Sequence, residues 1–206
     1  MDMGNISRRE ALKISGMGIL GVLGLQQTGL GAAADSDVPV ITMNGNFSTG
    51  QWSFDPIGLY IQKGQKVRWT AKEWGCTVFA FHPSNYNHEL RIPEGAKPFG
   101  SGDVPLMKTS YQGRNVFEWT FDVEGTYDCF SRDQEILGMV CRIVVGKPGG
   151  PAEKPPGYGG RDGRSVVFPR QVKMFEFCPA TEIVAKKSIP YPKDFVINPH
   201  PYGIHG

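Results

Sequence analysis

The sequence predicts an all-β protein, a sandwich or barrel of about eight short strands. Three observations support this prediction. Short runs of alternating apolar and polar residues recur through residues 38–145, with turn residues between them. No segment in that range repeats its apolar residues at helical spacing. Glycine (27) and proline (16) form about a fifth of the 206 residues, above the usual share of about 12%, which favours turns over helices.

The expected strands follow one another along this range, and turn signals separate them. Gly64-Gln65 and Glu124-Gly125 are read as tight turns, and the long segment 82–108, which contains several prolines, as a loop with at most one helical turn. Strands are expected at residues 38–43, 52–54, 59–62, 66–72, 77–81, 115–122, 126–130 and 140–145.

The N-terminal segment is not expected to belong to this fold. Residues 7–13, SRREALK, resemble the twin-arginine export motif, and small residues at 31–34 suit a signal peptidase. Residues 1–34 are therefore predicted to be a signal peptide that directs the protein to the periplasm. The 21 uncharged residues 14–34 come close to the ~20 that span a bilayer. An uncleaved anchor at the outer face of the cytoplasmic membrane thus remains an alternative.

Charge and motifs exclude several classes of function. The formal net charge is +2 and no run is rich in Lys or Arg, so nucleic acid is not an expected partner. The G-x-S-x-G, H-E-x-x-H, Walker and dinucleotide-binding patterns are all missing, and the protein is predicted not to be an enzyme. The acids Asp122, Glu124 and Asp128 are interpreted as the solvated face of a strand and a turn.

The chain contains four cysteines, Cys76, Cys129, Cys141 and Cys178. In an exported protein they are expected to form two disulfides, for which three pairings exist. Metal ligation is the rival interpretation, although the chain has no C-x-x-C pair. Four buried thiols remain a further alternative.

The composition changes after Gly146. Residues 147–163 form a linker rich in Pro and Gly, and residues 164–206 form a tail with many apolar and aromatic groups. A disordered tail would be depleted in such groups, so this tail is expected to lie on its own β-domain or on another protein, and the second is favoured. The candidate partner-binding residues are Phe168, Phe175, Phe177, Tyr191, Phe195 and Tyr202.

Several motifs within residues 38–146 occur in the order of one known family. They are TVFAFHP at 77–83, RIPEGA at 91–96, GTY at 125–127, GMV at 138–140 and IVV at 143–145. On these motifs the segment resembles the cupredoxins, the blue copper proteins of the plastocyanin and azurin type. The resemblance covers about half of the chain. It implies a Greek-key β-sandwich of about seven or eight strands for residues 35–146.

The resemblance also indicates where copper ligands should stand. A type-1 copper site needs two imidazoles, one thiolate and a weak axial thioether. The family pattern Cys-x-x-His-x4-Met puts Ser131 in place of the thiolate and Gln134 in place of the second histidine, and only Met139 matches. The first histidine falls at Cys76 or, less well, at Thr77. A serine hydroxyl is too hard and too weakly acidic to replace a thiolate, so the site is predicted to be degenerate and copper-free.

The histidines do not offer a substitute site. His82 has the strand parity of Cys76, but six residues of extended strand separate the two by about 20 Å. His88 follows in the same long loop, and His200 and His205 lie in the tail. All four are interpreted as surface or turn residues.

The resemblance further implies a disulfide pairing. If Ser131 faces Met139 across the last hairpin, Cys129 faces Cys141 at a distance that a disulfide can span. Closing this loop would contribute about 3 kcal/mol in the chain-entropy model. The remaining pair, Cys76–Cys178, would then tie the tail near the empty pocket. Another pairing, or free thiols, remains open.

These observations predict a copper-free protein that acts as a structural or docking subunit of a membrane-bound electron-transfer complex, respiratory or photosynthetic. The choice of complex is an analogy with the family. Its partners would be protein subunits, and the membrane too if residues 1–34 persist. A charged loop top formed by residues 132–135 argues modestly against electron transfer. The alternatives are a redox or copper-carrying protein that uses Met139, Cys76 and another thiol, or a protein that binds a small ligand in the vacated pocket.

Overall fold

A computed structural model describes residues 38–46, 48, 50–72, 75–86, 89–103, 105–106, 115–159 and 167–194. The predicted signal or anchor segment, residues 1–34, lies outside these ranges, as do Phe195 and Tyr202. None of the helices within them is long and apolar enough to cross a membrane.

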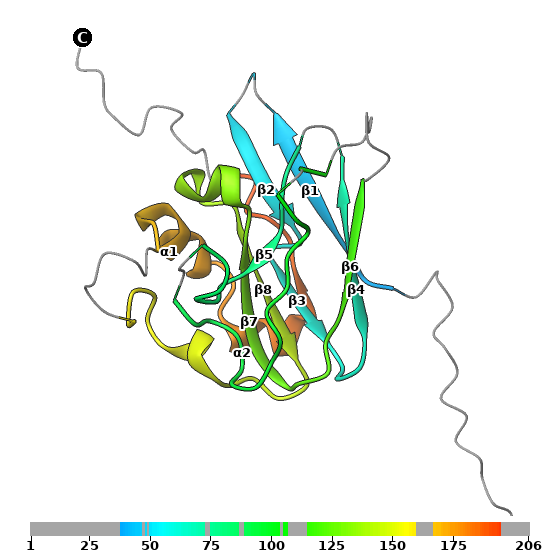
Figure 1. Cartoon of the computed structure of the whole chain (residues 1–206), viewed down its shortest axis with the longest axis vertical. Coiled ribbons are helices and arrows are strands. Elements are labelled where there is room, and N and C mark those ends of the chain that lie inside the picture. The colour runs from blue at the N-terminus through cyan, green and yellow to red at the C-terminus, as the bar shows by residue number, and fades with distance from the viewer. Residues whose placement is uncertain are drawn as a thin grey trace, which may run out of the picture. The chain divides into compact units, whose positions relative to one another are not determined.

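Two β-sheets pack face to face (Figure 1). The first sheet, in the order β2-β1-β4-β6, has four strands and the second, in the order β5-β7-β8-β3-β9, has five. The pairs β1–β4 and β3–β8 are parallel and the other pairs are antiparallel. The strands are β1 (Val40–Asn46), β2 (Gln51–Asp55), β3 (Gly58–Ile61), β4 (Lys66–Ala71), β5 (Phe79–Ala80), β6 (Val116–Thr120), β7 (Gly125–Phe130), β8 (Val140–Val145) and β9 (Ser188–Ile189). The β-sandwich and all eight expected strands are confirmed.

Alternation along the strands sends one set of apolar side chains between the sheets. In β4, Val67, Trp69 and Ala71 are buried while the residues between them are more exposed. Trp69 contacts the rings of Phe99 and Phe121, with centroids 5.9 and 6.3 Å away. We call this layer between the sheets the inner core. Strands β7 and β8 are buried along their whole length, so the second sheet must also be covered on its outer face.

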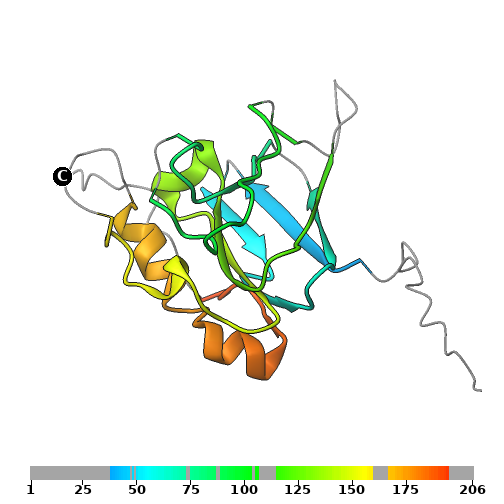
Figure 2. The same ribbon diagram turned by 60° about the horizontal axis from the view of Figure 1, so that its bottom comes forward.

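The C-terminal tail covers that outer face (Figures 1 and 2). Helices α1 (Pro169–Phe175) and α2 (Ala180–Lys186) follow the linker, and β9 then pairs with β3. Their apolar side chains form a second cluster with the outer face of the sheet, which we call the outer core: Ile57, Phe79, Phe81, Phe130, Val140, Val144, Met174, Phe175, Cys178, Ala180, Ile183, Ile189 and Tyr191. The favoured prediction, that the tail lies on another protein, is therefore wrong for residues 167–194.

Close backbone contacts fix the tail to the sheet. The Tyr60 backbone N–H donates to the Lys187 carbonyl (2.8 Å), and the Tyr191 N–H donates to Asp55 Oδ1 (2.9 Å). Helix α2 crosses β3 at Gly58, where a Cβ atom would stand 2.8 Å from Cγ1 of Ile183. A side chain at this position would therefore require Ile183 to shift.

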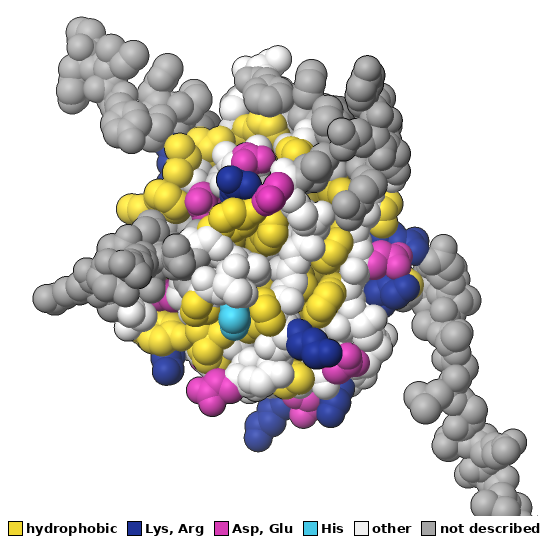
Figure 3. Space-filling model, in the orientation of Figure 1, with side chains coloured by type: hydrophobic (Ala, Val, Ile, Leu, Met, Phe, Trp, Pro, Cys, Tyr) yellow, Lys and Arg dark blue, Asp and Glu magenta, His cyan; other side chains and the backbone are white. Residues whose placement is uncertain are grey.

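Charged side chains on the face shown in Figure 3 lie in small mixed groups. In Figure 3, Lys or Arg side chains lie beside Asp or Glu side chains, so this face has no region of a single sign. Exposed ion pairs include Lys66–Glu118 (2.8 Å) and Lys186–Glu182 (2.6 Å). Such pairs contribute little to stability, about 0–1 kcal/mol each.

Candidate functional site

The loop between β7 and β8 occupies the position that the cupredoxin resemblance assigns to copper. A single 3-10 helix, η2 (Arg132–Leu137), fills it and ends at Gly138, which has a φ of 84°. The Ser131 N–H donates to the Met139 carbonyl (3.1 Å). Cys129 pairs with Cys141 in the flanking strands. The predicted hairpin register is therefore confirmed.

Three buried polar side chains stand together where the resemblance places ligands. The Ser131 hydroxyl donates to Oε1 of Gln134 (2.5 Å) and accepts from the Thr77 backbone N–H (3.2 Å). Oγ1 of Thr77 in turn accepts from the Arg132 N–H (2.9 Å). We call this group the Thr77–Ser131–Gln134 cluster. Its oxygens are neutral and hard, and they are engaged with one another or with backbone, so they are poor ligands for copper.

The exposed top of the loop differs from the prediction. Gln134, expected beside the charged residues, points inward and is only 7% exposed. Arg132 and Asp133 are exposed as expected, and so is the apolar Ile136 (48%). The Arg132 guanidinium lies 4.3 Å from the centre of the Tyr86 ring. The loop top therefore presents a mixture of charged and apolar groups.

Cys76 and Met139 are both fully buried in the inner core. The Cys76 backbone is bonded to Leu106, with N···O distances of 3.1 and 2.8 Å. Burial, with a smaller contribution from the Asp133 carboxylate, raises the pKa of the Cys76 thiol to about 12. Within the described ranges no three His, Cys, Asp or Glu side chains converge on one point.

The histidines provide no such centre in the part of the chain that the structure describes. His82 is half-buried, and its Nδ1 lies 2.8 Å from the Ser84 hydroxyl. Burial lowers the pKa of His82. His88, His200 and His205 lie outside the described residues.

The four cysteines are buried free thiols in this structure. Cys129 and Cys141 face each other across the hairpin. Burial, with a smaller contribution from the neighbouring Cys141, raises the pKa of the Cys129 thiol. Cys178, in contrast, belongs to the outer core and Cys76 to the inner core. The predicted Cys76–Cys178 bridge is therefore wrong in this arrangement, because the two side chains lie in separate clusters. The Cys129–Cys141 bridge stays a prediction.

Alkylation will test the two cysteine pairs separately. In protein purified from an oxidising compartment and unfolded without reductant, we expect Cys76 and Cys178 to react, and Cys129 and Cys141 to react only after reduction. Mass spectrometry of the labelled peptides measures this. The Cys129→Ser/Cys141→Ser variant is the control and should show no further labelling after reduction. Four reactive thiols in the unreduced protein would exclude the bridge.

The buried thiols also predict a loss of stability at high pH. Because the folded pKa of Cys76 is about 12 and the model-compound value is 9.0, the unfolded state releases its proton first. The stability that the buried, protonated Cys76 thiol contributes is fully present below pH 9 and is lost as the pH rises from about 9 to 12. We expect the free energy of unfolding to fall over this window. The Cys76→Ala variant should show a shallower pH dependence, and an equal slope would contradict this explanation.

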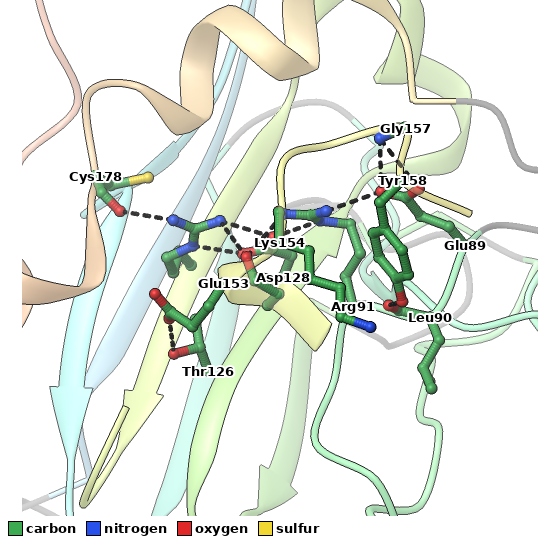
Figure 4. A network of polar contacts seen from close by, with 12 residues as sticks. Glu89, Leu90, Arg91, Thr126, Asp128, Glu153, Lys154, Gly157, Tyr158 and Cys178 are labelled. Carbon is green, nitrogen blue, oxygen red and sulfur yellow. Dashed lines mark hydrogen bonds and ion pairs between the residues drawn. The ribbon is translucent and has the colours of Figure 1, made fainter. Parts of the chain in front are cut away.

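A network of buried charges lies on the outer face of the second sheet (Figure 4). Asp128 of β7 accepts through Oδ1 from Nε of Arg142 (2.7 Å) and through Oδ2 from Nε of Arg91 (2.8 Å). Nη1 of Arg91 donates in turn to Glu89 (2.8 Å). We call these four residues the buried charge network. Asp128, Glu89 and Arg91 are at most 2% exposed, so the interpretation of Asp128 as solvated is wrong.

The network holds the linker against the sheet (Figure 4). Nη2 atoms of Arg91 and Arg142 both donate to the carbonyl of Ala152 (2.9 and 3.2 Å), in the short 3-10 helix η3 (Pro151–Glu153). The Glu89 carboxylate accepts from the N–H groups of Gly157 (3.0 Å) and Gly159 (3.2 Å). The linker thus supplies further hydrogen-bond partners for these buried charges.

The network also reaches the tail. The Phe175 ring at the end of α1 lies 5.4 Å from the Arg91 guanidinium and 5.0 Å from that of Arg142. Burial opposes the charge on Arg142, but the carboxylate of Asp128 outweighs burial and raises the pKa of Arg142. One charge cluster therefore joins the sheet, the linker and the tail.

The predicted partner-binding residues are largely used inside the protein. Phe175 and Tyr191 are buried in the outer core, and Phe177 packs against it. Phe168 is half-buried at the start of α1. None of these four side chains forms part of an exposed aromatic surface, and Phe195 and Tyr202 lie outside the described residues.

Comparison with known proteins gives similarities of fold alone. No protein-family model and no curated protein sequence matches the chain. Among solved structures it is similar to a pseudoazurin from Methylobacterium extorquens AM1 (21% identity, TM-score 0.44, 57% of this chain and 85% of that one). Others are a pseudoazurin from Hyphomicrobium denitrificans (19%, 0.41, 53% and 76%) and a plastocyanin from Dryopteris crassirhizoma (17%, 0.38, 52% and 99%).

Proposed function

We propose that the protein is a copper-free, non-enzymatic cupredoxin-like subunit that is exported and serves a structural or docking role. Its place would be at the outer face of the cytoplasmic membrane, in a respiratory or photosynthetic electron-transfer complex. The proposal that the site lacks copper rests on the Thr77–Ser131–Gln134 cluster. A site whose polar groups bond to one another offers a metal no free donor, and it has no thiolate.

The surroundings of this cluster support the same reading. Helix α1 of the tail packs on η2, so that a Cβ atom on Gly138 would stand 3.1 Å from Cβ of Arg170. The tail therefore covers one side of the loop through which a blue copper site would exchange electrons. The buried charge network in turn holds linker and tail in one arrangement, which suits a part with a fixed shape in an assembly.

The alternative function is a copper carrier with a sulfur-rich site. Cys76, Cys129, Cys141 and Met139 all belong to the inner core, and Cu(I) accepts thiolate and thioether ligands. Thiolate is the form that binds metal, however, and burial raises the pKa of both Cys76 and Cys129. Binding copper there would have to overcome this cost.

Copper loading distinguishes the two functions. Purified protein is incubated with Cu(I) or Cu(II), passed through gel filtration and analysed for metal and for visible absorption. We expect no retained copper and no thiolate-to-copper charge-transfer band. The Met139→Leu variant is the matched control, since it should behave identically. Stoichiometric Cu(I) that is lost in Met139→Leu would establish the sulfur-rich site instead.

The docking role needs a separate test in the native membrane. Gentle detergent solubilisation, followed by native electrophoresis and mass spectrometry, should show the protein in a fixed ratio with membrane-embedded electron-transfer subunits. A protein that runs alone would contradict the subunit role, whatever the copper result.

A further inference from the structure

A hollow whose lining includes several polar side chains lies on the outer face of the first sheet, remote in sequence from the cupredoxin loop. It has a volume of about 290 Å³ and is bounded by β1, β2, the residue after β4 and the end of the described tail. At about 30 Å³ for each water, this volume equals roughly ten water molecules. The hollow is thus large enough for one sugar ring. Its lining residues are Asn44, Gly45, Asn46, Gln51, Ser53, Asp55, Lys72, Tyr191 and Lys193.

Strand register explains why polar groups gather there. Asn44 pairs with Ser53 and Asn46 with Gln51 across β1 and β2. Their side chains share the outer face, because the inner-core residues of these strands alternate with them. The tail forms the far wall, where the Tyr191 N–H donates to Oδ1 of Asp55 (2.9 Å).

Several of these side chains have no internal partner. Among the described residues, no hydrogen bond or ion pair engages the side chains of Asn44, Gln51, Ser53, Lys72 and Lys193. Ser53 is only 4% exposed, so its hydroxyl lies at the base of the hollow rather than on open surface. The amides of Asn44 and Gln51 and the hydroxyl of Ser53 can each donate and accept hydrogen bonds. The two lysines only donate.

The charge of the hollow selects among polar ligands. Lys72 and Lys193 against Asp55 give a net charge of +1. A phosphate group carries about −1.5 to −2 at neutral pH, which exceeds this charge. A single carboxylate matches it, and the hydroxyls of a sugar match the amides and Ser53. We propose that the hollow binds a monosaccharide that carries one carboxylate, a sugar acid. This proposal is independent of the proposed function.

Titration followed by protein NMR, with D-glucuronate as the probe, tests the proposal. We expect saturable shifts confined to backbone amides around the hollow, with a dissociation constant in the millimolar range. D-glucose, which has the same ring without the carboxylate, should bind about tenfold more weakly, since two exposed ion pairs contribute up to about fivefold each. Glucose 6-phosphate should also bind more weakly than glucuronate.

Variants connect the binding to the residues. The Lys72→Gln/Lys193→Gln variant should weaken glucuronate binding about tenfold and leave glucose binding unchanged. Lys186→Gln on α2 is the matched control and should change neither. The proposal is overturned if glucuronate gives no saturable shifts, if glucose binds equally well, if the phosphate binds more tightly, or if the double variant binds as the wild type does.

Discussion

Replacing Asp128 with alanine should lower the free energy of unfolding by about 3–5 kcal/mol, the usual cost of removing one partner from a buried ion pair. The variant leaves the guanidinium of Arg142 buried at 7% exposure without its carboxylate. Arg91 keeps Glu89 as a partner. The loss should therefore come mainly from Arg142. Urea unfolding followed by circular dichroism measures it.

A surface ion pair provides the matched control for this variant. Glu118 also accepts from two cations, Lys66 and Arg68, but its side chain is 27% exposed. Glu118→Ala should cost only about 0–1 kcal/mol. The Asp128→Leu/Arg142→Met variant should recover part of the stability that Asp128→Ala loses, because it removes the guanidinium together with its carboxylate partner. Equal effects of Asp128→Ala and Glu118→Ala would contradict a role for the network in stability.

Replacing Phe175 with alanine should also cost about 3–5 kcal/mol, since it opens a cavity in the outer core. Phe175 joins the apolar cluster to the two guanidiniums of Arg91 and Arg142. Phe175→Leu keeps most of the volume but loses the cation–π contacts, so it should cost about 2 kcal/mol. The measurement is again the free energy of unfolding of the isolated protein.

Ile136→Ala serves as the control for Phe175, because this apolar side chain is 48% exposed. It should change stability by no more than about 0.5 kcal/mol. The comparison also tests where the tail belongs. If Phe175→Ala left the isolated protein as stable as the wild type, the tail would not depend on its own sheet, and the alternative of another protein as its support would return.

The sequence was sufficient to predict the sandwich because its strands alternate clearly and its turns carry glycine. It also predicted the last hairpin register, in which Cys129 faces Cys141. The same register pairs Asp128 with Arg142. The predicted register is therefore enough to place the two residues of the central ion pair opposite each other. The sequence nevertheless predicts a solvated Asp128, because an acid next to a turn usually is solvated and nothing local indicates that a distant linker covers it.

The tail was harder to predict for a physical reason. Helices α1 and α2 each have seven residues, fewer than two full turns, so neither can show a helical period. Isolated helices this short are unstable in water and form only when they pack on another surface. That surface is the apolar outer face of the second sheet. The second sheet is buried on both of its faces, and this becomes apparent only when β7 and β8 are placed in the sandwich.

Strand β9 has a consequence for how the protein can assemble. A free edge strand can pair with a strand from another molecule and so start aggregation. Without β9, strand β3 would be such an edge, with four residues open to pairing. The chain closes that edge with only two residues, Ser188 and Ile189, too short a template for further addition. We therefore do not expect another protein to bind by adding a strand at this edge of the sandwich.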